Sequence, residues 1–583
     1  MKTQLRRREV VDARHLSDNI HPCNVHPRLR QIYAARGVKN AQELELGING
    51  LLGYQQLHGI ATAVSVLQQA LTDGCRIMIV GDFDADGATS TALAVLALRR
   101  MGAISVDYLI PNRFEDGYAL SPAIVERAAA SDARLIVTVD NGITSHAGVE
   151  LAHSKGIQVI VTDHHLPAET LPAADAIVNP NLPGCNFPSK SLAGVGVTFY
   201  LMIALRARLR ACGWFDQQRL AIPNLAELLD LVALGTVSDV VPLDANNRIL
   251  VHQGICRIRA GLCRPGINAL LKVAKRDARK LMASDLAFSL GPRLNAAGRL
   301  DDMSRGVALL LSDDETLTRK IACDLDALNQ SRREIEQSMQ QEALQLCTQL
   351  EQTLTELPTG IAITHPHWHQ GVVGILASRI KDRFHRPVIA FAPATEGILK
   401  GSGRSVAGLH MRDALARLDS LHPGLIVKFG GHAMAAGLSL KQEKFDQFQH
   451  CFAELVSEWL DPSQLEGLIW SDGALTEQEF SPEMAELLRA GGPWGQGFPE
   501  PVFDGRFRLL QQRLLGERHL KVIMEPLSGG PVLDGIAFNI DTQLWPDSRI
   551  QEAEVAYKLD INEFRGTRNL QLLIQQLWAI TSG

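Results

Sequence analysis

The stretch from about residue 74 to residue 200 alternates short apolar runs with helical patterns, and this alternation constrains the fold more than any other feature of the chain. The expected strands are CRIMIVGD, SVDYLIP, RLIVTVD, GIQVIVTD and DAIVN, and segments such as ATSTALAVLALRRMG and SPAIVERAAAS have helical patterns. Strands that are apolar on both faces and separated by helices are typical of a parallel sheet covered on both sides. We therefore expect an α/β domain here.

Beyond this stretch, the pattern of apolar and polar residues changes three more times along the chain. Residues 195–345 have mostly helical patterns, and the polar stretch from Asp313 to Leu357 contains no Gly or Pro, which predicts one long helix. A smaller α/β unit follows, and beyond residue 460 short strands with turn signals predict a small β-barrel. We expect a multidomain α/β chain with an N-terminal segment (1–70), a parallel-sheet domain (71–312), a connecting helix (313–356), a smaller α/β domain (357–458) and an OB-like barrel (459–583).

Composition limits the class of protein without identifying it. With 46% hydrophobic and 21% charged residues, the chain has the composition of an ordinary soluble protein, and no apolar run reaches the ~18 residues of a membrane span. The basic N-terminal stretch is followed by no apolar signal region, so we expect a cytoplasmic location and no contact with a membrane. The net charge of −6 argues against a simple nucleic-acid coat protein, but an enzyme with a local basic stripe stays compatible with it.

Carboxylates and imidazoles follow three of the expected strands, at the point where each strand ends. The carboxyl ends of parallel strands meet at one edge of a sheet, so we expect these side chains to converge although they are far apart in sequence. They are Asp82, Asp84 and Asp86 after the first strand, Asp140 after the third, and Asp163, His164 and His165 after the fourth.

Such a cluster predicts a site for divalent metal ions. Carboxylates gathered in one cleft repel one another, and bound cations relieve that repulsion. The excess of oxygen ligands over nitrogen favours Mn²⁺ or Mg²⁺, and a two-metal site with Asp140 as the bridging carboxylate suits phosphoryl transfer. Each piece alone has an ordinary explanation: a helix cap for Asp140, a structural His-His pair, or a calcium loop for the DADG run. The calcium loop would need a Glu where this chain has Leu93.

The same residues carry a family resemblance. GDFDADG, VTVDNGI and VTDHH resemble motifs of the DHH phosphoesterase superfamily, and PNRFEDGYALS and LGTVSDVVPL resemble further motifs of its exonuclease branch. GPRLNAAGRL, HWHQGVVGILASRI, GSGRS and FGGHAMAAG resemble the middle segments of that branch and its associated DHHA1 domain. The match keeps its order from about residue 75 to residue 440, so the chain is similar to the bacterial DHH enzymes that degrade single-stranded DNA.

The resemblance implies roles for individual residues around the metals. His165 takes a catalytic or substrate-contacting position, while we interpret Asp86 and Asp163 as residues that orient the loop and the histidines for catalysis. Many members have a histidine where this chain has Val80, so one ligand of the commoner pattern is missing. The implied metal ligands are Asp82, Asp84, Asp140, His164 and Asp239.

The resemblance also implies a path for nucleic acid. A pocket for a 5′-phosphate would be formed by Arg113, Ser402 and Arg404; arginine binds phosphate in a bidentate way, and the GSGRS turn exposes backbone N–H groups. For Arg113 taken alone, a surface salt bridge with Glu115 or Asp116 is the simpler explanation. His432, in the segment FGGHAMAAG, is also expected to contact the nucleic acid, with a plain tight turn as the alternative explanation for that segment. The residues expected to track the strand are Arg293, Asn295 and Arg299.

The function implied by the resemblance is that of a 5′→3′ exonuclease. Such an enzyme degrades single-stranded DNA by metal-dependent phosphodiester hydrolysis in DNA repair and recombination, as a monomer with single-strand-binding protein and a repair helicase as partners. The alternative is a DHH–DHHA1 phosphodiesterase for short oligoribonucleotides or cyclic dinucleotides, which usually lacks the barrel. A catalytically inactive scaffold is disfavoured because every motif acid is present.

Overall fold

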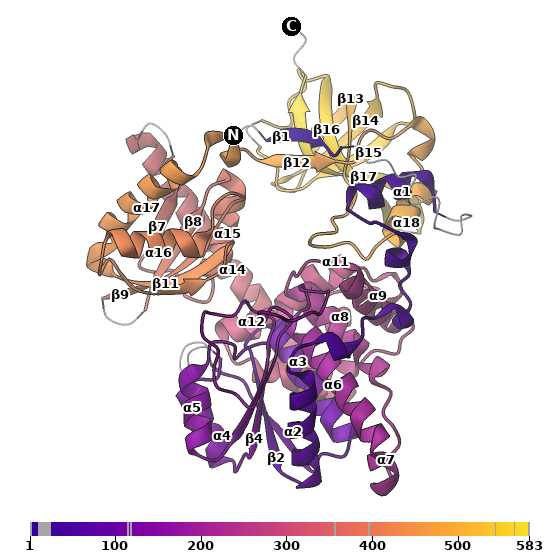
Figure 1. Ribbon diagram of the computed structural model, residues 1–583. Helices are drawn as coiled ribbons and strands as arrows, with labels where there is room; N and C mark the ends of the chain where they lie inside the picture. The colour runs from indigo at the N-terminus through magenta and orange to yellow at the C-terminus, as the bar shows by residue number, and fades with distance from the viewer. Residues whose placement is uncertain are drawn as a thin grey trace.

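The computed structural model describes residues 3–9, 25–112, 116, 119–354, 357–394, 397–542, 544–564 and 566–580. Figure 1 shows a helix-covered parallel sheet at the bottom, a smaller mixed sheet at the upper left and a closed barrel at the upper right. The predicted α/β class, with a parallel-sheet domain, a second α/β domain and a terminal barrel, is confirmed.

The lower sheet is entirely parallel, with the strand order β3-β2-β4-β5-β6. Successive strand residues point to opposite faces, so Ile77 and Ile79 enter the large core while Met78 and Val80 enter a separate cluster with Ile124. Both faces are therefore buried, as the continuous apolar runs predicted. The strands are β2 (Arg76–Gly81), β3 (Ser105–Leu109), β4 (Leu135–Val139), β5 (Gln158–Thr162) and β6 (Ala176–Val178).

Helices cover both faces of this sheet and then continue as a helical layer. One face packs against α2 (Ile60–Thr72), α3 (Ala85–Arg100) and α6 (Gly194–Ala211), and the other against α4 (Pro122–Ala130) and α5 (His146–Ser154). The layer beyond contains α7 (Trp214–Gln217), α8 (Leu229–Ser238), α9 (Ala245–Arg259), α10 (Pro265–Val273), α11 (Ala283–Asp285), the π-helical turn η7 (Leu286–Leu290), α12 (Gly291–Leu300) and α13 (Ser304–Leu311).

One helix of 40 residues, α14 (Glu315–Leu354), joins the lower domain to the smaller one. At 1.5 Å per residue it is about 60 Å long. It contacts α10, α12 and α13 on the side of the lower domain and α15 on the side of the smaller domain. The prediction of a single helix without a break is confirmed over these residues, because no helix breaker occurs in them.

The smaller domain has a mixed sheet with the order β10-β11-β9-β8-β7, in which only β7 and β8 are parallel. Helices α14 and α15 pack on one face, and α16 and α17 on the other. The elements are β7 (Ile361–Thr364), α15 (Val373–Phe384), β8 (Val388–Pro393), β9 (Ile398–Arg404), α16 (Met411–Leu421), β10 (Ile426–Gly431), β11 (Ala435–Lys441) and α17 (Phe445–Trp459).

The last part of the chain forms a closed barrel in the order β13-β14-β15-β17-β16. Residues from the other end of the chain pack against it. Strand β1 (Gln4–Arg7) pairs in parallel with β12 (Leu468–Ser471), and α1 (Pro27–Ala35) lies beside α18 (Pro482–Ala490) (Figure 1). The barrel strands are β13 (Phe503–Leu515), β14 (His519–Pro526), β15 (Leu533–Ala537), β16 (Glu552–Phe564) and β17 (Thr567–Ala579).

Among the described helices, none combines the length and the apolarity that a membrane crossing requires.

Candidate metal centre

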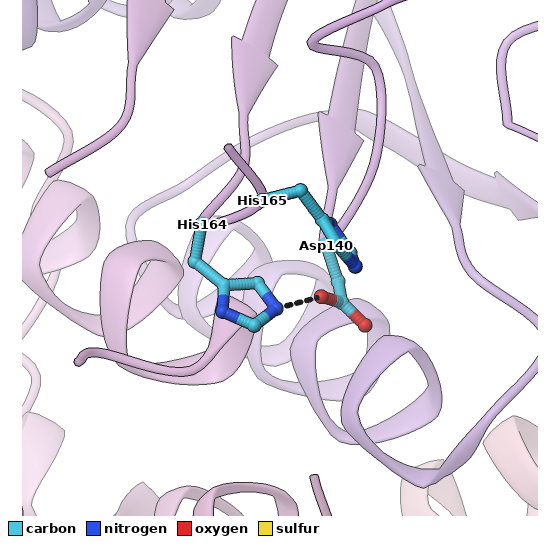
Figure 2. Close-up of side chains that lie close together, drawn as sticks. All are labelled: Asp140, His164 and His165. Carbon is cyan, nitrogen blue, oxygen red and sulfur yellow. Dashed lines mark ion pairs between the residues drawn. The ribbon is translucent and has the colours of Figure 1, made fainter. Parts of the chain in front are cut away.

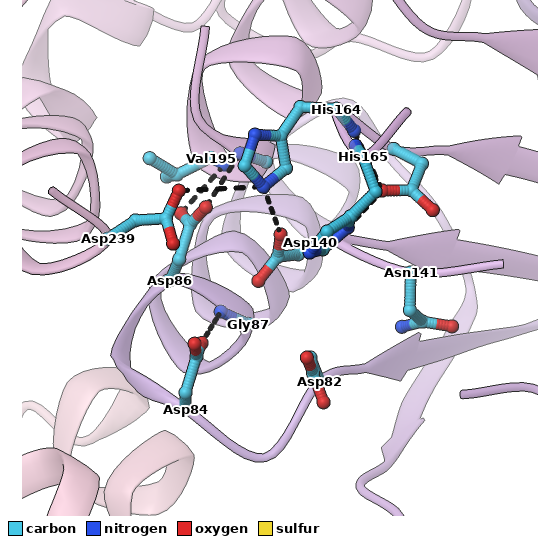
Figure 3. A network of polar contacts seen from close by, with 12 residues as sticks. Asp82, Asp84, Asp86, Gly87, Asp140, Asn141, His164, His165, Val195 and Asp239 are labelled. Atoms are coloured by element: carbon cyan, nitrogen blue, oxygen red, sulfur yellow. Dashed lines mark hydrogen bonds and ion pairs between the residues drawn. The ribbon is translucent and has the colours of Figure 1, made fainter. Parts of the chain in front are cut away.

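The C-terminal ends of three neighbouring strands bring the predicted side chains together. Strands β2, β4 and β5 lie side by side, and the loops that leave them carry residues 82–86, 140 and 163–165. Asp239 reaches the same place from the helical layer, where it follows the last residue of α8. Figure 3 shows these carboxylates and imidazoles gathered at one edge of the sheet. The convergence expected from the strand ends is thus present in the structure.

Three groups of ligand atoms lie close enough to hold a cation. Within each group, one oxygen or nitrogen from every member lies within 4.8 Å of the others. Asp140 and His164 each belong to two groups, so the groups are joined through shared residues. This arrangement fits two neighbouring ions better than one. The groups are Asp82, Asp84 and Asp140; Asp140, His164 and His165; and Asp86, His164 and Asp239.

The centre of the cluster is the contact between His164 and Asp140 (Figure 2). The Nε2 atom of His164 lies 3.1 Å from Oδ1 of Asp140 and 3.5 Å from Oδ2 of Asp239. His164 Nε2 and Asp140 Oδ1 are both buried, and neither is aligned for a hydrogen bond with any described residue. Buried polar atoms without partners are costly. Two such atoms, which face one another as an ion pair, are suited to act together as ligands of a metal ion.

The backbone holds Asp140 in an unusual conformation. Its φ angle is +62°, in the left-handed region that costs a non-glycine residue free energy and occurs mainly at functional sites. The neighbouring Asn141 fixes this turn, since its side-chain N–H groups donate to the carbonyls of Val80 and Val139 at 3.0 and 2.9 Å. Gly194 makes room for the carboxylate, because a Cβ atom there would lie 2.6 Å from Asp140 Oδ1.

The carboxylates of the first loop are held by the start of α3. Asp84 caps this helix and accepts a hydrogen bond from the N–H of Gly87 at 3.0 Å. Ala85, the residue after Asp84, donates its backbone N–H to Oδ1 of Asn295 at 2.7 Å. Asn295 lies on α12, so this helix also fixes the loop. Asp82 accepts from the N–H of Phe83 at 2.7 Å. Both side chains are thus positioned by local backbone donors and keep further lone pairs for a cation.

Asp86 is more deeply buried than its neighbours and is held by α6. Its two oxygens accept the N–H groups of Gly194 and Val195, at 2.6 and 2.9 Å, at the start of that helix. The carboxylate nevertheless lies within ligand distance of His164 and Asp239. The orienting role expected for Asp86 agrees with its two backbone donors, and the structure adds a second position for it, beside a metal ligand (Figure 3).

Asp163 organises the histidine loop without pointing at the cluster. Its carboxylate accepts the backbone N–H groups of Ile143, His164 and His165, and its Oδ1 lies 2.7 Å from Nδ1 of His165. Burial lowers the pKa of His165, but the hydrogen bond and charge of Asp163 outweigh it and raise this pKa to about 10. Burial likewise raises the pKa of Asp163, and its bond with His165 brings it down to about 2. The two residues therefore form a lasting ion pair at neutral pH.

Three buried carboxylates, those of Asp86, Asp140 and Asp239, have pKa values shifted in the opposite direction. Burial, followed by the charges of neighbouring carboxylates, raises the pKa of Asp140 and Asp86 well above the ordinary value, and burial raises that of Asp239. Burial lowers the pKa of His164. A lowered pKa keeps an imidazole neutral and free to act as a ligand, while the raised pKa values show that the charged carboxylates are disfavoured, by burial first and by repulsion from neighbouring carboxylates second. A divalent cation removes that repulsion, so the donor set fits Mn²⁺ or Mg²⁺.

Val80, which stands where many members of the family have a histidine, is part of the hydrophobic core. Val80 is fully buried, and its side chain packs with Ile124 and Val125 beneath the sheet. Its backbone carbonyl still serves the site by accepting a hydrogen bond from Asn141. Within the described residues, the three groups of candidate metal ligands include no side chain from position 80.

The smaller domain contributes residues at the edge of the centre. The ring of His432, just after β10, stacks on His165 with centroids 5.9 Å apart and an angle of 15° between the planes. On β9, Arg404 donates to Ser402 Oγ at 3.0 Å. Both side chains lie against Gly374 in the first turn of α15, where a Cβ atom would come within 3.0 Å of each. Ser402, Arg404 and a helix N-terminus thus share one place, whereas Arg113 lies outside the described residues.

The three residues expected to track a strand all lie on α12 but differ in their surroundings. Arg293 pairs with Asp326 at 2.8 Å and donates to the carbonyl of Ser289, so it fastens α12 to α14. Asn295 and Arg299 line a cleft between α12, α14, α15 and the barrel. Arg299 also donates to the carbonyl of Gly371 at 3.1 Å.

Sequence patterns did not reveal the backbone groups that hold the site. The N–H groups of Gly194 and Val195 carry no side-chain chemistry, and the Asn295 bond to Ala85 joins residues far apart in the chain. The one available signal was the glycine pair in LAGVGVTF, because a glycine at a helix start often marks a close approach of the backbone.

Three domain families match the chain in order: the DHH family N-terminal domain over residues 76–236, the DHHA1 domain over 357–458 and the RecJ OB domain over 471–576. Together with the carboxylate and histidine cluster, these matches define a DHH-type phosphoesterase. The single-stranded-DNA-specific exonucleases RecJ of Dickeya dadantii and Escherichia coli are 69% and 68% identical to it, over 99% of this chain and of each relative. The chain therefore belongs to the RecJ family.

Solved structures agree with this assignment. The crystal structure of RecJ from Thermus thermophilus in complex with Mn²⁺ has a TM-score of 0.79 and 31% sequence identity, and the match covers 99% of this chain and 80% of that one. A complex of the same protein with Mg²⁺ has a TM-score of 0.74 and 29% identity, and covers 99% and 79% of the two chains.

Proposed function

We propose that this chain is a metal-dependent exonuclease that degrades single-stranded DNA from its 5′ end. The observation that carries the proposal is the joined cluster of carboxylates and imidazoles at the sheet edge, in a chain that is 69% identical to a RecJ exonuclease. The barrel, matched by the RecJ OB domain, favours a long strand as substrate over the short oligoribonucleotides or cyclic dinucleotides of other DHH–DHHA1 enzymes.

The metal site has five proposed ligand residues: Asp82, Asp84, Asp140, His164 and Asp239. When bound there, Mn²⁺ or Mg²⁺ supplies Lewis-acid stabilisation of charge on the phosphoryl oxygens. Asp86 is proposed to fix the start of α6 against the site, through its bonds to Gly194 and Val195. It shares the role of positioning with Asp163.

His165 is proposed to contact the substrate directly. Asp163 keeps its imidazole protonated at neutral pH, so the ring presents a positive charge beside the carboxylate cluster. A cation at that place stabilises a non-bridging phosphate oxygen as negative charge grows on it. Stacking on His432 of the smaller domain holds the ring in position.

A 5′-phosphate pocket is proposed at Ser402 and Arg404. The guanidinium and hydroxyl lie together at the first turn of α15, where backbone N–H groups favour an anion. Arg113 is proposed as a third member from the sequence motif alone. A pocket that binds the terminal phosphate defines the end from which the strand is degraded.

The cellular role is proposed from the resemblance to the exonuclease branch of the DHH family, not from the geometry of the site. We propose a cytoplasmic enzyme of DNA repair and recombination that acts as a monomer, with single-strand-binding protein and a repair helicase as partners.

The test is digestion of end-labelled DNA. The wild type with Mn²⁺ should release nucleotides from the 5′ end of a phosphorylated single strand, leave a blunt duplex intact and stop when the metal is chelated. Asp140→Asn should be inactive although folded, as judged by circular dichroism. Preferred cleavage of a short oligoribonucleotide or a cyclic dinucleotide would replace this function with the alternative one.

A further inference from the structure

A polar cleft of about 710 Å³ lies where the lower domain, the connecting helix, the smaller domain and the barrel meet. Its walls come from η7, α12, α14 and α15, and from barrel residues Arg518 and Asn539. The cleft is unusually rich in arginine. Its charged residues are Arg299, Arg332, Arg333, Arg379, Arg518 and Glu336.

The charge balance in the cleft favours an anionic polymer. Glu336 is the single carboxylate of the lining, and it accepts hydrogen bonds from Arg332 at 2.6 Å and from Arg379 at 2.8 Å. It thereby joins α14 to α15 and holds two guanidinium groups at the cleft wall. Arg333 and Arg518 are both exposed, the first on α14 and the second in the turn that precedes β14. Five arginines against one glutamate attract a row of phosphates.

One residue of the cleft lining also supports the metal-binding loop. Asn295 lines it and also accepts a hydrogen bond from Ala85, the residue after Asp84, at 2.7 Å. Helix α12 is therefore both a wall of the cleft and a support of the metal-binding loop. A strand whose end lies at the metals has this cleft as its neighbouring path.

Phe288 is an aromatic residue at the rim of the cleft, and 73% of its surface is exposed. It lies in the π-helical turn η7, whose other large side chains, Leu286 and Leu290, are fully buried. π-Helical turns are uncommon and often occur at functional sites, because the extra residue turns a side chain outward. A single exposed Phe side chain on a protein surface is by itself ordinary. An exposed ring beside guanidinium groups is the combination that binds unpaired nucleotides.

We propose that Phe288 is a base-stacking residue: an unpaired base of the strand stacks on its ring while the neighbouring phosphates lie along Arg333 and Arg518. The proposal rests on the proposed function and adds a specificity-determining contact to it. In a duplex both faces of a base are covered by neighbouring pairs, so the contact selects a strand whose bases are free. Stacking on Phe288 also fixes the register of the strand in the cleft.

Binding of a fluorescent single strand, measured with chelator present so that no hydrolysis occurs, separates stacking from charge. Phe288→Ala should weaken binding about tenfold with an unchanged salt dependence, because the ring contributes stacking rather than charge. Arg333→Ala and Arg518→Ala should each lower the slope of log affinity against log salt by about one. Phe288→Tyr should restore binding, and Trp459→Ala, which removes another exposed aromatic ring, should have no effect.

A strand with one abasic nucleotide, moved through every position from the 5′ end, gives the decisive comparison. The wild type should lose about tenfold in affinity at one position, and Phe288→Ala should show no loss there. Equal losses in both proteins, or unchanged binding by Phe288→Ala, would overturn the stacking role. Cleavage by the wild type with Mn²⁺ is a separate readout, so a failed cleavage assay counts against the proposed function, while the abasic pattern alone decides the role of Phe288.

Discussion

At the scale of single residues, the site depends on a carboxylate that points away from the proposed metals. Asp163 collects three backbone N–H groups and the His165 ring, and is almost fully buried. These bonds fix the loop that carries His164, so a residue outside the three groups of candidate ligands sets the position of one of their members.

We expect Asp163→Asn to lower turnover roughly 10- to 100-fold, the range found for residues that orient metal ligands. Asparagine keeps one oxygen acceptor but loses the charge that holds the proton on His165, whose pKa falls from about 10 towards its ordinary value. The pH profile of kcat should therefore gain a basic limb at lower pH than in the wild type. An unchanged profile and rate would contradict the role given to this pair.

Gly194→Ala is expected to weaken Mn²⁺ binding, because the added Cβ would lie 2.5 Å from Cβ of Asp140 and 2.6 Å from its Oδ1. Calorimetric titration with Mn²⁺ measures the effect. The matched control is Gly196→Ala on the same helix, where the new Cβ meets only the flexible end of Leu192 at 3.0 Å. Similar metal affinity in both variants would show that this close approach does not constrain the centre.

The sequence was sufficient to place the cluster because strand ends of a parallel sheet share one edge. Asp82, Asp140 and His164 follow strands that are neighbours in the sheet, so their meeting needed no knowledge of long-range packing. The bond between Asp86 and Gly194 could not be predicted. It joins residues more than a hundred positions apart through a backbone N–H, which has no residue type to recognise.

At the scale of elements, the N-terminal helix is fastened to the C-terminal part of the chain. Tyr33 of α1 stacks on Trp494 with centroids 6.0 Å apart and donates a hydrogen bond to the carbonyl of Gly491. Arg28 makes two bonds to Glu479, at 2.7 and 2.6 Å. The sequence predicted an N-terminal segment but gave no sign of where it docks, since such pairs depend on the tertiary fold.

This contact should weaken in acid. Burial raises the pKa of Glu479, but the Arg28 bonds outweigh it and lower the pKa from 4.5 to about 2. A lowered pKa means that the contact stabilises the folded state fully above pH 4.5 and is lost as the pH falls through about 2. Hydrogen exchange of the α1 amides should be faster in Glu479→Gln than in the wild type at neutral pH. This difference should shrink as the pH falls towards 2; a constant difference would contradict the assignment.

At the scale of the whole molecule, the metal centre and the stability of the lower domain are coupled. Burial, together with repulsion from neighbouring carboxylates, raises the pKa of Asp140, Asp86 and Asp239, so charging them together in the metal-free site costs free energy. These carboxylates lie among the edge of the parallel sheet and the helices α3, α6 and α8. A bound cation that removes the repulsion therefore stabilises all of these elements together.

Saturating Mn²⁺ should therefore raise the thermal midpoint of the lower domain, by the equivalent of about 2.7 kcal/mol at a hundred times the dissociation constant. Scanning calorimetry with Mn²⁺ and with chelator measures the shift. Asp140→Asn should be more stable than the wild type in chelator, because one repelling charge is gone, and should respond less to Mn²⁺. A variant that is less stable in chelator and keeps the full response would contradict this account.

The order of the domains along the chain was predictable because each has its own periodicity: apolar runs with helices, one unbroken helix, and then short strands with turns. The contacts between the domains were not. The arginine-lined cleft takes residues from four elements, and the Glu336 bridge between α14 and α15 exists only once both are placed. Charged side chains on helices are usually solvated, so nothing in the sequence pattern indicates this bridge.

The pairing of β1 with β12 has a consequence for how the protein is made. Its two strands are separated by about 460 residues, and at roughly 5–20 residues per second a ribosome needs on the order of 20 to 90 s to add that much chain. Throughout this interval Gln4–Arg7 has no partner strand, although the last strand of the parallel sheet, β6, is synthesised before residue 180. Its joining to the barrel is therefore a late event of biosynthesis, and a growing chain carries an open strand edge for most of its time on the ribosome.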